Sequence, residues 1–325
     1  MSNGNEVDAV SPLRNYLELL RLPNIFTAMA DVAMGFLFVQ QSGQPGQDDF
    51  PGQFQPADAW VLGLLVMASS MLYAAGVVLN DVFDMELDRQ QRPERPLPSG
   101  RISLRAARWL GWELLLLGII LPCGVAVVLR QPRTAVVVTL LALAIVLYNA
   151  VLKRTVLGPL AMGGCRMLNV LLGMSVLLGT WQAEHWLVSA AVGVYIVGVT
   201  WLARSEDQQS DARQLAAATA VMMAGVALLA WLPRWSENLV PLLVIEPQRW
   251  YILMALLGGM IAWRCLWAIA EPAPGRVQTA VAHAIMSLVI LDAAACYAVR
   301  GTYWAIVILL LLLPATFLGR WIQST

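Results

Sequence analysis

The sequence predicts an all-α fold, a polytopic membrane bundle of nine or ten transmembrane helices. Of its 325 residues, 59% are hydrophobic and only 13% are charged, whereas soluble domains have about 45–50% apolar and about 25% charged residues. Apolar windows of 17–25 residues, the length that spans a bilayer as a helix, recur along the chain with few polar loops between them. A chain with this much apolar surface can keep it from water only inside a lipid bilayer.

We expect two parts, a polar N-terminal segment over residues 1–21 and a single transmembrane domain over residues 22–320. The first dozen residues, MSNGNEVDAVSP, have neither the basic start nor the apolar stretch of a signal peptide. Ten apolar windows are candidate spans, at residues 22–40, 58–80, 105–129, 134–151, 157–179, 185–203, 213–232, 250–269, 277–298 and 302–319. Only Val299-Arg300-Gly301 separates the last two, so they form either a tight hairpin or one span followed by a re-entrant piece.

The distribution of Lys and Arg predicts which loops share a compartment. With loops numbered from the N-terminus, the even side, which includes both termini, holds fourteen of the 21 basic residues, and the odd side holds five. Basic residues accumulate in cytoplasmic loops. We therefore expect an integral protein of a bacterial inner membrane. Both termini, and the loops after the second, fourth and sixth spans, would face the cytoplasm.

Cysteine and histidine content disfavours several kinds of site. The four cysteines lie in apolar stretches without CxxC spacing, and the chain has only two histidines. A disulfide framework, a zinc site and a haem site are therefore disfavoured. The chain also lacks a basic tail or a basic helical face, so we expect no nucleic-acid partner.

Three carboxylates follow the second span at regular spacing. Asp81, Asp84 and Asp88 are spaced i, i+3, i+7, which places them within about 60° of one another on a continuous helix. Like charges this close repel unless a divalent cation lies among them. An all-oxygen site suits Mg²⁺, which takes its remaining ligands from water and substrate phosphates. The alternative, an ordinary charged helix end, is disfavoured by the spacing and by the apolar run before it.

A second acidic pair, Asp207 and Asp211, follows the sixth span at i, i+4 spacing. On the same side of the membrane, the two acidic clusters could hold a Mg²⁺-bridged diphosphate between two halves of four helices. The competing interpretation is that this pair lies in a solvated loop and binds nothing.

Basic residues also occur in the loops after the second and fourth spans. Arg92 and Arg95 follow the first acidic cluster, and Lys153 and Arg154 come shortly after Tyr148 at the end of the fourth span. These cations could neutralise phosphate oxygens, with arginine offering two parallel hydrogen bonds. Ordinary flanking of a span by positive charge would account for Lys153 and Arg154 equally well.

Taken together, these motifs resemble the UbiA superfamily of intramembrane prenyltransferases. The matching motifs are Asn-Asp-x-x-Asp-x-x-x-Asp from Asn80, Arg-Pro-Leu-Pro-Ser-Gly-Arg from Arg95, and Tyr-x-x-x-Leu-Lys-Arg from Tyr148. The resemblance covers about residues 14–300. It implies two four-helix halves around a central cavity. It also implies Mg²⁺-dependent transfer of a polyprenyl group from its diphosphate to an apolar or aromatic acceptor within the bilayer.

The resemblance assigns roles to individual residues. Asp81 and Asp84 would act in catalysis, with Tyr148 near the allylic carbon. The metal ligands implied are Asn80, Asp81, Asp84, Asp88, Asp207 and Asp211. The diphosphate ligands implied are Arg92, Arg95, Lys153 and Arg154. Asn24 in the first span would face the cavity.

Five polar residues lie inside predicted spans, where they are costly in hydrocarbon and should face the interior or pair. They are Asp31, Arg166, Arg264, His283 and Asp292. Asp31 and Arg166 are one possible pair, and Arg166 could instead touch phosphate from the cavity wall.

Three features depart from the family pattern. The context of Asp207 and Asp211 is unusual for the second acidic motif, and ten spans exceed the customary nine. The segment 162–169 resembles a UbiA-like branch of bacterial gene clusters of the Ebo type. Two alternatives to an enzyme therefore stay open. One is a catalytically degenerate relative that binds or transports an isoprenoid, and the other is a secondary transporter.

Overall fold

The computed structural model describes residues 12–40, 54–204, 211–235 and 243–321, and these residues form helices joined by turns. The helices are α1 (Pro12–Leu19), α2 (Leu22–Val39), α3 (Pro56–Phe83), α4 (Met85–Gln91), α5 (Leu104–Leu129), α6 (Pro132–Ala150), η1 (Leu152–Arg154), α7 (Gly158–Met174), α8 (Ala183–Ala203), α9 (Ala212–Ala230), α10 (Leu232–Trp235), α11 (Pro247–Ala270), α12 (Pro274–Arg300), α13 (Thr302–Leu309) and α14 (Leu312–Trp321). The predicted fold class, an all-α bundle of membrane-spanning helices, is confirmed.

Within the described ranges, nine helical segments are long and apolar enough to cross a membrane, the last of them spanning Thr302–Gly319. The one predicted window that is not among these nine, residues 157–179, corresponds to α7, which has 17 residues, near the lower limit for a span. The final two windows form the hairpin rather than a re-entrant piece. Gly301 makes the turn at φ 79°, a left-handed conformation that glycine adopts without a steric cost.

The last span is broken in its middle. Helix α13 ends at Leu309 and α14 starts at Leu312. Pro314 explains the break, because proline has no N–H to bond the carbonyl of Leu310 and its ring clashes with that carbonyl in a continuous helix.

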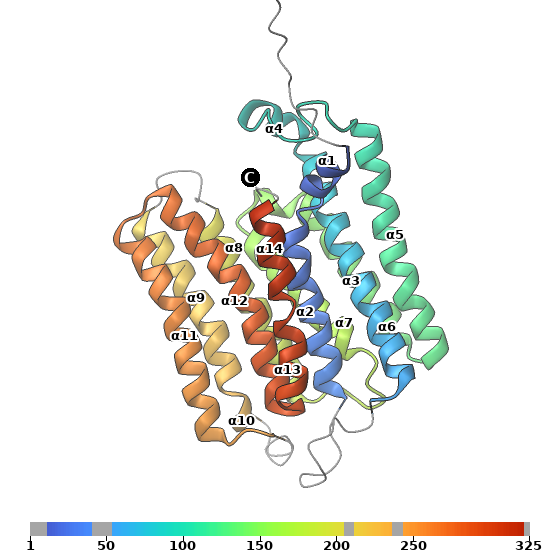
Figure 1. Cartoon of the computed structure of the whole chain (residues 1–325), viewed down its shortest axis with the longest axis vertical. Helices are drawn as coiled ribbons and strands as arrows, with labels where there is room; N and C mark the ends of the chain where they lie inside the picture. The colour runs from blue at the N-terminus through green and yellow to red at the C-terminus, as the bar shows by residue number, and fades with distance from the viewer. Residues whose placement is uncertain (1–11, 41–53, 205–210, 236–242, 322–325) are drawn as a thin grey trace, which may run out of the picture.

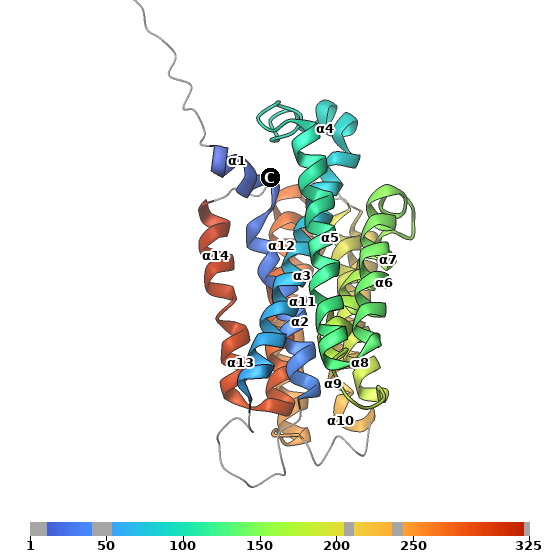
Figure 2. The same ribbon diagram turned by 90° about the vertical axis from the view of Figure 1, so that its right-hand side faces the viewer.

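Both views show the helices as one elongated bundle with short α1, α4 and the last turn of α14 at the same end, which we call the α4 end (Figures 1 and 2). Contacts show that residues directly after the second, fourth and sixth predicted spans meet there. Lys153, after α6, lies 2.7 Å from Asp84 at the end of α3. Arg204, after α8, donates to the carbonyl oxygens of Lys153 and Thr155.

Helix α2 is central to the bundle, in contact with α3, α7, α12, α13 and α14. Figure 1 shows α3, α5 and α6 on one side of it and α9, α11 and α12 on the other. Fourteen of its 18 residues are buried, so a polar residue on this helix has to find its partner within the protein.

Glycines allow α2 and α7 to approach closely. A Cβ atom added to Gly173 would lie 2.1 Å from the carbonyl oxygen of Val32, and one added to Gly35 would lie 2.2 Å from that of Val170. Small residues at such crossings let membrane helices pack through their backbones. The close approach brings the polar residues of α2 and α7 within hydrogen-bonding distance of each other.

We expect Gly173→Ala to destabilise the protein, because the added methyl group meets backbone that cannot move without separating α2 from α7. Overpacking of this kind typically costs about 1–3 kcal/mol. The thermal unfolding midpoint in detergent should fall, whereas Gly164→Ala on the same helix, with nothing within 4 Å of the added carbon, should leave it nearly unchanged. Equal midpoints for the two variants would contradict the account of this helix crossing.

Two of the polar residues in predicted spans do not face the interior. Arg264 on α11 and His283 on α12 are exposed on the outer surface of the described bundle, so the expectation that they face inward was wrong. Arg264 lies six residues before the end of α11, and a long basic side chain at that depth can reach the polar edge of the bilayer.

Candidate active site

A cavity of about 370 Å³ lies between α3, α6 and α7, within the volume range of small-ligand sites. Along α3 it extends from Asn80 at the α4 end to Ser69, a rise of roughly 16 Å along the helix. The wall between these ends is largely apolar, with Leu72, Val77 and Ile145 among its residues. The cavity therefore has a polar mouth, an apolar middle and a second polar region at its inner end.

The lining residues follow the helical period. On α7, Met162, Cys165, Arg166 and Asn169 line the cavity at i, i+3, i+4, i+7 spacing, which is one face of a helix. On α6, Tyr148 lines it as predicted. The predicted cavity role of Arg166 is thus supported by its place in the wall.

Two of the predicted carboxylates converge on one arginine. Arg95 Nη1 lies 3.0 Å from Asp88 Oδ2 and 3.9 Å from Asp81 Oδ1. Arg21 Nη2 donates to the same Asp81 oxygen at 2.9 Å. Asp81, Asp88 and Arg95 are buried, so these charges interact with little screening by water.

Asp84 takes part in a separate set of contacts. Its two carboxylate oxygens accept hydrogen bonds from Lys153 Nζ at 2.7 Å and Arg154 Nη2 at 2.9 Å. Lys153 also donates to Asn80 Oδ1 at 3.0 Å. Cations from the loop after α6 therefore meet the acidic end of α3.

The predicted continuous helical face of Asp81, Asp84 and Asp88 needs correction. Helix α3 ends at Phe83 and α4 begins at Met85, with Asp84 between them at φ −95° and ψ 5°. Figure 1 shows α4 turned away from the axis of α3. Asp84 consequently faces Lys153 and Arg154, whereas Asp81 and Asp88 share Arg95.

The donor set at the mouth fits Mg²⁺ in kind, because Asn80, Asp81, Asp84 and Asp88 offer only hard oxygen or amide ligands. The described residues contain no group of three acidic, histidine or cysteine side chains arranged around one point. Asp81 and Asp88 both approach one cationic group, Arg95, whose Nη1 lies 3.9 Å and 3.0 Å from their carboxylate oxygens.

Burial alters the proton affinity of one of these cations. The Lys153 side chain is 9% exposed, and burial lowers the pKa of its ammonium group while the adjacent Asp84 carboxylate opposes that shift. Lys153 therefore loses its charge at a lower pH than an ordinary lysine.

Arg21 is a site residue that the sequence interpretation missed. It lines the cavity mouth, pairs with Asp81 and has φ 46°, an uncommon conformation for a residue other than glycine. Asn24, the predicted cavity residue, is half-buried one turn further along and is not among the lining residues. Arg92 is at the end of α4 with an intermediate exposure.

The second acidic motif is not brought to the cavity by the described residues. Asp207 lies outside them. Asp211 is the exposed N-cap of α9, where its side chain accepts a hydrogen bond from the backbone N–H of Arg213 at 2.9 Å. Helix capping alone accounts for an aspartate at that position.

Comparison with known proteins decides the family. Residues 50–284 match the family model described as the UbiA prenyltransferase family. The chain belongs to the UbiA prenyltransferase family.

Relatives of this UbiA chain include a digeranylgeranylglyceryl phosphate synthase of Methanosarcina barkeri, 32% identical over 168 residues. That match covers 50% of this chain and 55% of the relative. In general the chain spans about half the length of the curated relatives it matches. With nine apolar helices in its described part and this family membership, it is an integral membrane protein.

Two solved structures share the fold. The structure of a digeranylgeranylglyceryl phosphate synthase aligns with a TM-score of 0.63 at 21% identity, covering 90% of this chain and all of the other. A UbiA homologue from Archaeoglobus fulgidus bound to GPP and Mg²⁺ aligns with a TM-score of 0.58 at 15% identity, covering 84% and 99%.

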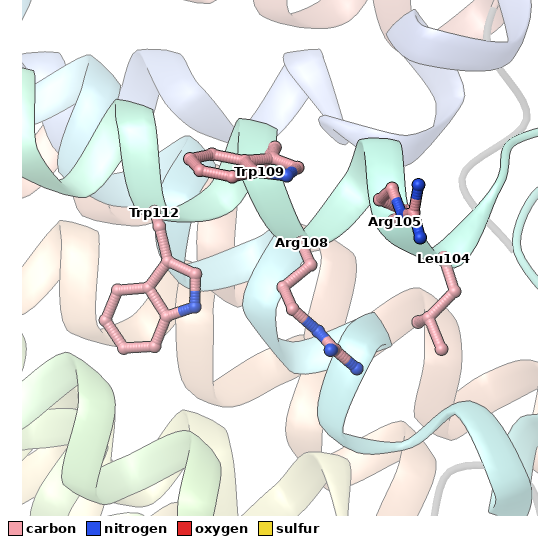
Figure 3. A pocket seen from close by; sticks show the side chains of 5 residues that line it. All are labelled: Leu104, Arg105, Arg108, Trp109 and Trp112. Atoms are coloured by element: carbon pink, nitrogen blue, oxygen red, sulfur yellow. The ribbon is translucent and has the colours of Figure 1, made fainter.

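This UbiA chain has a second hollow, on the outer face of α5 and separate from the cavity. It measures about 510 Å³ and is lined by Leu104, Arg105, Arg108, Trp109 and Trp112. Figure 3 shows the two arginines and two indole rings along the first turns of α5. Exposed tryptophan and arginine together are typical of the boundary between bilayer and water, and this hollow lies toward the α4 end of the bundle.

Proposed function

We propose that the protein is a membrane prenyltransferase that transfers a prenyl group from its diphosphate to a lipophilic acceptor inside the cavity. One observation carries the proposal. At the cavity mouth, acidic residues from α3 and α4 meet cations from three other segments, directly above an apolar wall. A prenyl diphosphate has the matching design, a highly charged head on an apolar tail.

The proposal gives the charged residues distinct tasks. Asp81, Asp84 and Asp88, with Asn80, would hold Mg²⁺, which when bound supplies neutralisation of the diphosphate and stabilises charge on the leaving group. Lys153, Arg154 and Arg95, now paired with carboxylates, would bind phosphate oxygens of the donor instead. These groups are already ordered by their ion pairs, so they need little reorganisation when the donor binds.

The cavity wall serves the other half of the reaction. Tyr148 presents an aromatic ring near the mouth, and the face of such a ring attracts positive charge that develops on the allylic carbon. The apolar middle of the cavity excludes water, which would otherwise capture the cation. The relatives named as digeranylgeranylglyceryl phosphate synthases and the homologue bound to GPP and Mg²⁺ support a prenyl diphosphate as donor.

The orientation and extent of the domain are further parts of the proposal. The excess of Lys and Arg at the α4 end supports a cytoplasmic location for that end, with residues 22–320 as one transmembrane domain. The named relatives are archaeal, so they give no support to a bacterial membrane or to the Ebo-type branch.

Release of inorganic diphosphate tests the proposal directly. Purified protein would be incubated in detergent with Mg²⁺, an acceptor-containing lipid extract, and geranyl, farnesyl or geranylgeranyl diphosphate. We expect release with at least one donor and its loss on addition of EDTA. Mg²⁺-dependent donor binding without release from any mixture would instead identify a non-catalytic isoprenoid-binding protein.

The lowered pKa of Lys153 predicts an alkaline limit to donor binding. As pH rises through that pKa, the ammonium group deprotonates and one of the cations facing the diphosphate is lost. The KM for the donor should therefore begin to rise at a pH below the one at which an ordinary lysine loses its charge. Lys153→Arg keeps its charge in that range, so its KM should stay flat. Parallel pH profiles for the two proteins would contradict this role.

A further inference from the structure

The hollow on the outer face of α5 carries two cations that the proposed reaction does not use. Arg105, Arg108, Trp109 and Trp112 line it at i, i+3, i+4, i+7 spacing, which places them on one face of the helix. Figure 3 shows Arg108 and Trp112 projecting from α5 on the same side. At about 510 Å³, the hollow is within the volume range of small-ligand sites.

This face of α5 points away from the bundle. On the other side of the helix, a Cβ atom added to Gly111 would lie 2.9 Å from Leu79 Cδ2 of α3. Gly111 lies roughly 120° around the helix axis from Arg105. Trp109, in the wall of the hollow, is 65% exposed. In an integral membrane protein, a hollow on such an outer face opens to the lipid bilayer.

Several arginines of the described structure are paired with carboxylates. Arg166 Nη1 on α7 lies 2.7 Å from Asp31 Oδ2 on α2, which confirms that predicted pair. Further pairs are Arg21 with Asp81, Arg95 with Asp88, Arg101 with Glu18, and Arg154 with Asp84. Among the described residues, by contrast, Arg105 and Arg108 have no hydrogen-bond or ion-pair partner. Their guanidinium groups are therefore available to a ligand.

The two arginines are unfavourably placed for the helix itself. The first turn of α5 has no acidic residue, and cations near a helix N-terminus oppose the helix dipole. A spacing of three residues also brings the two like charges together. In the described structure neither group stacks on an indole ring, as Arg276 does over Trp267 at 5.6 Å. Glu113, the one acid in the sequence of α5, is not among the lining residues. A bound anion would offset both repulsions.

An apolar track leads from the hollow toward the middle of the membrane. Leu116 and Ile120 follow Trp112 at i+4 and i+8, and they are 58% and 51% exposed. Ile120 lies twelve residues after Arg108, a rise of roughly 18 Å. Half of the hydrocarbon core of a bilayer is about 15 Å thick. This surface therefore fits a ligand with an anionic head and an acyl chain that reaches across one leaflet.

We propose that the hollow on α5 binds an anionic phospholipid of the leaflet at the α4 end, with its phosphate between Arg105 and Arg108. Guanidinium groups bind phosphate oxygens through parallel N–H bonds. The indole N–H groups of Trp109 and Trp112 donate to the ester carbonyls below the phosphate, and an acyl chain lies along Leu116. A zwitterionic lipid has the same phosphate, but its ammonium group meets a second guanidinium group. The site therefore prefers a head with net negative charge, whether or not the protein transfers prenyl groups.

Lipid binding to the full-length protein in detergent micelles tests the proposal. The probes are phosphatidylglycerol and phosphatidylcholine with the same fluorescent acyl chain. We expect wild type to bind phosphatidylglycerol about 30-fold more tightly, because each of the two arginines contributes a factor of about 5 toward an anionic lipid. Arg105→Gln combined with Arg108→Gln should remove most of this preference. Equal affinities of wild type for the two lipids would overturn the proposal.

Two further proteins guard the interpretation. Arg130→Gln is the matched control, because it removes the same charge from the other end of α5, outside the hollow, and its preference should equal that of wild type. Arg105→Lys combined with Arg108→Lys keeps both charges and should retain part of the preference. A preference that survives in the double glutamine variant, or that Arg130→Gln loses equally, would overturn the proposal.

Glycerol 3-phosphate distinguishes a lipid site from a general anion site. It carries the phosphate without acyl chains, so it should not displace phosphatidylglycerol at equal concentration. Trp112→Ala should weaken the binding of both lipids alike, because it removes apolar contact and no charge. Displacement by glycerol 3-phosphate at equal concentration, or unchanged affinities in Trp112→Ala, would overturn the lipid site.

Discussion

Asp84→Ala should lower the rate of diphosphate release by about 100-fold or more, a loss of the size seen when one electrostatic stabilising group is removed from an active site. Among the described residues, Asp84 is the single carboxylate that contacts both Lys153 and Arg154. Its removal takes away a proposed metal ligand and also the group that orders these two cations at the mouth of the cavity.

The matched control for Asp84→Ala is the variant Glu86→Ala. Glu86 lies two residues further on, is 83% exposed, and pairs only with exposed Arg89 in the described structure, so its loss should leave release within about twofold of wild type. The measurement is initial rate under saturating Mg²⁺ and donor. Equal rates for the two variants would show that Asp84 is not part of the active site.

Asp31→Ala should strongly destabilise the protein, because it leaves the guanidinium group of Arg166 in the membrane interior without its counter-charge. Breaking a buried ion pair by removing one partner typically costs about 3–5 kcal/mol. Asp31 is 0% exposed and Arg166 11%. We expect a large fall in the thermal unfolding midpoint in detergent, or in the yield of folded protein.

A double variant separates charge from packing. Asp31→Asn with Arg166→Gln removes both charges at similar volume, and replacing a buried pair in this way is often close to neutral. Its unfolding midpoint should recover most of the loss seen with Asp31→Ala. A double variant as unstable as the single one would show that the ion pair is not the cause.

Local pattern was sufficient for much of the site. Two clusters could be predicted because they lie within a few residues of a span end. They are Asp81, Asp84 and Asp88 after the second span, and Lys153 and Arg154 after the fourth. The helix break at Asp84 could not be predicted from this pattern, since placing residues at i, i+3 and i+7 on one face requires an uninterrupted helix.

A different kind of signal could have found part of the cavity wall. Met162, Cys165, Arg166 and Asn169 repeat at helical spacing within one apolar span, and all four side chains are polar or sulfur-containing. Arg21 had no such signal. It is one of several arginines that flank spans, and only its contact with Asp81, 60 residues away, distinguishes it.

Composition and spacing alone indicate a helical membrane protein with acids and cations near the ends of its spans on one side. Span length, hydrophobicity and loop charge are local properties, and the bilayer responds to each of them separately. Which acid pairs with which cation depends on the packing of the helices. Lys153 and Asp84 are 69 residues apart, and Arg166 and Asp31 are 135 apart. Such pairs depend on how helices pack, above all on the glycine-lined crossing of α2 and α7, because a buried charge is tolerated only where packing brings it a partner.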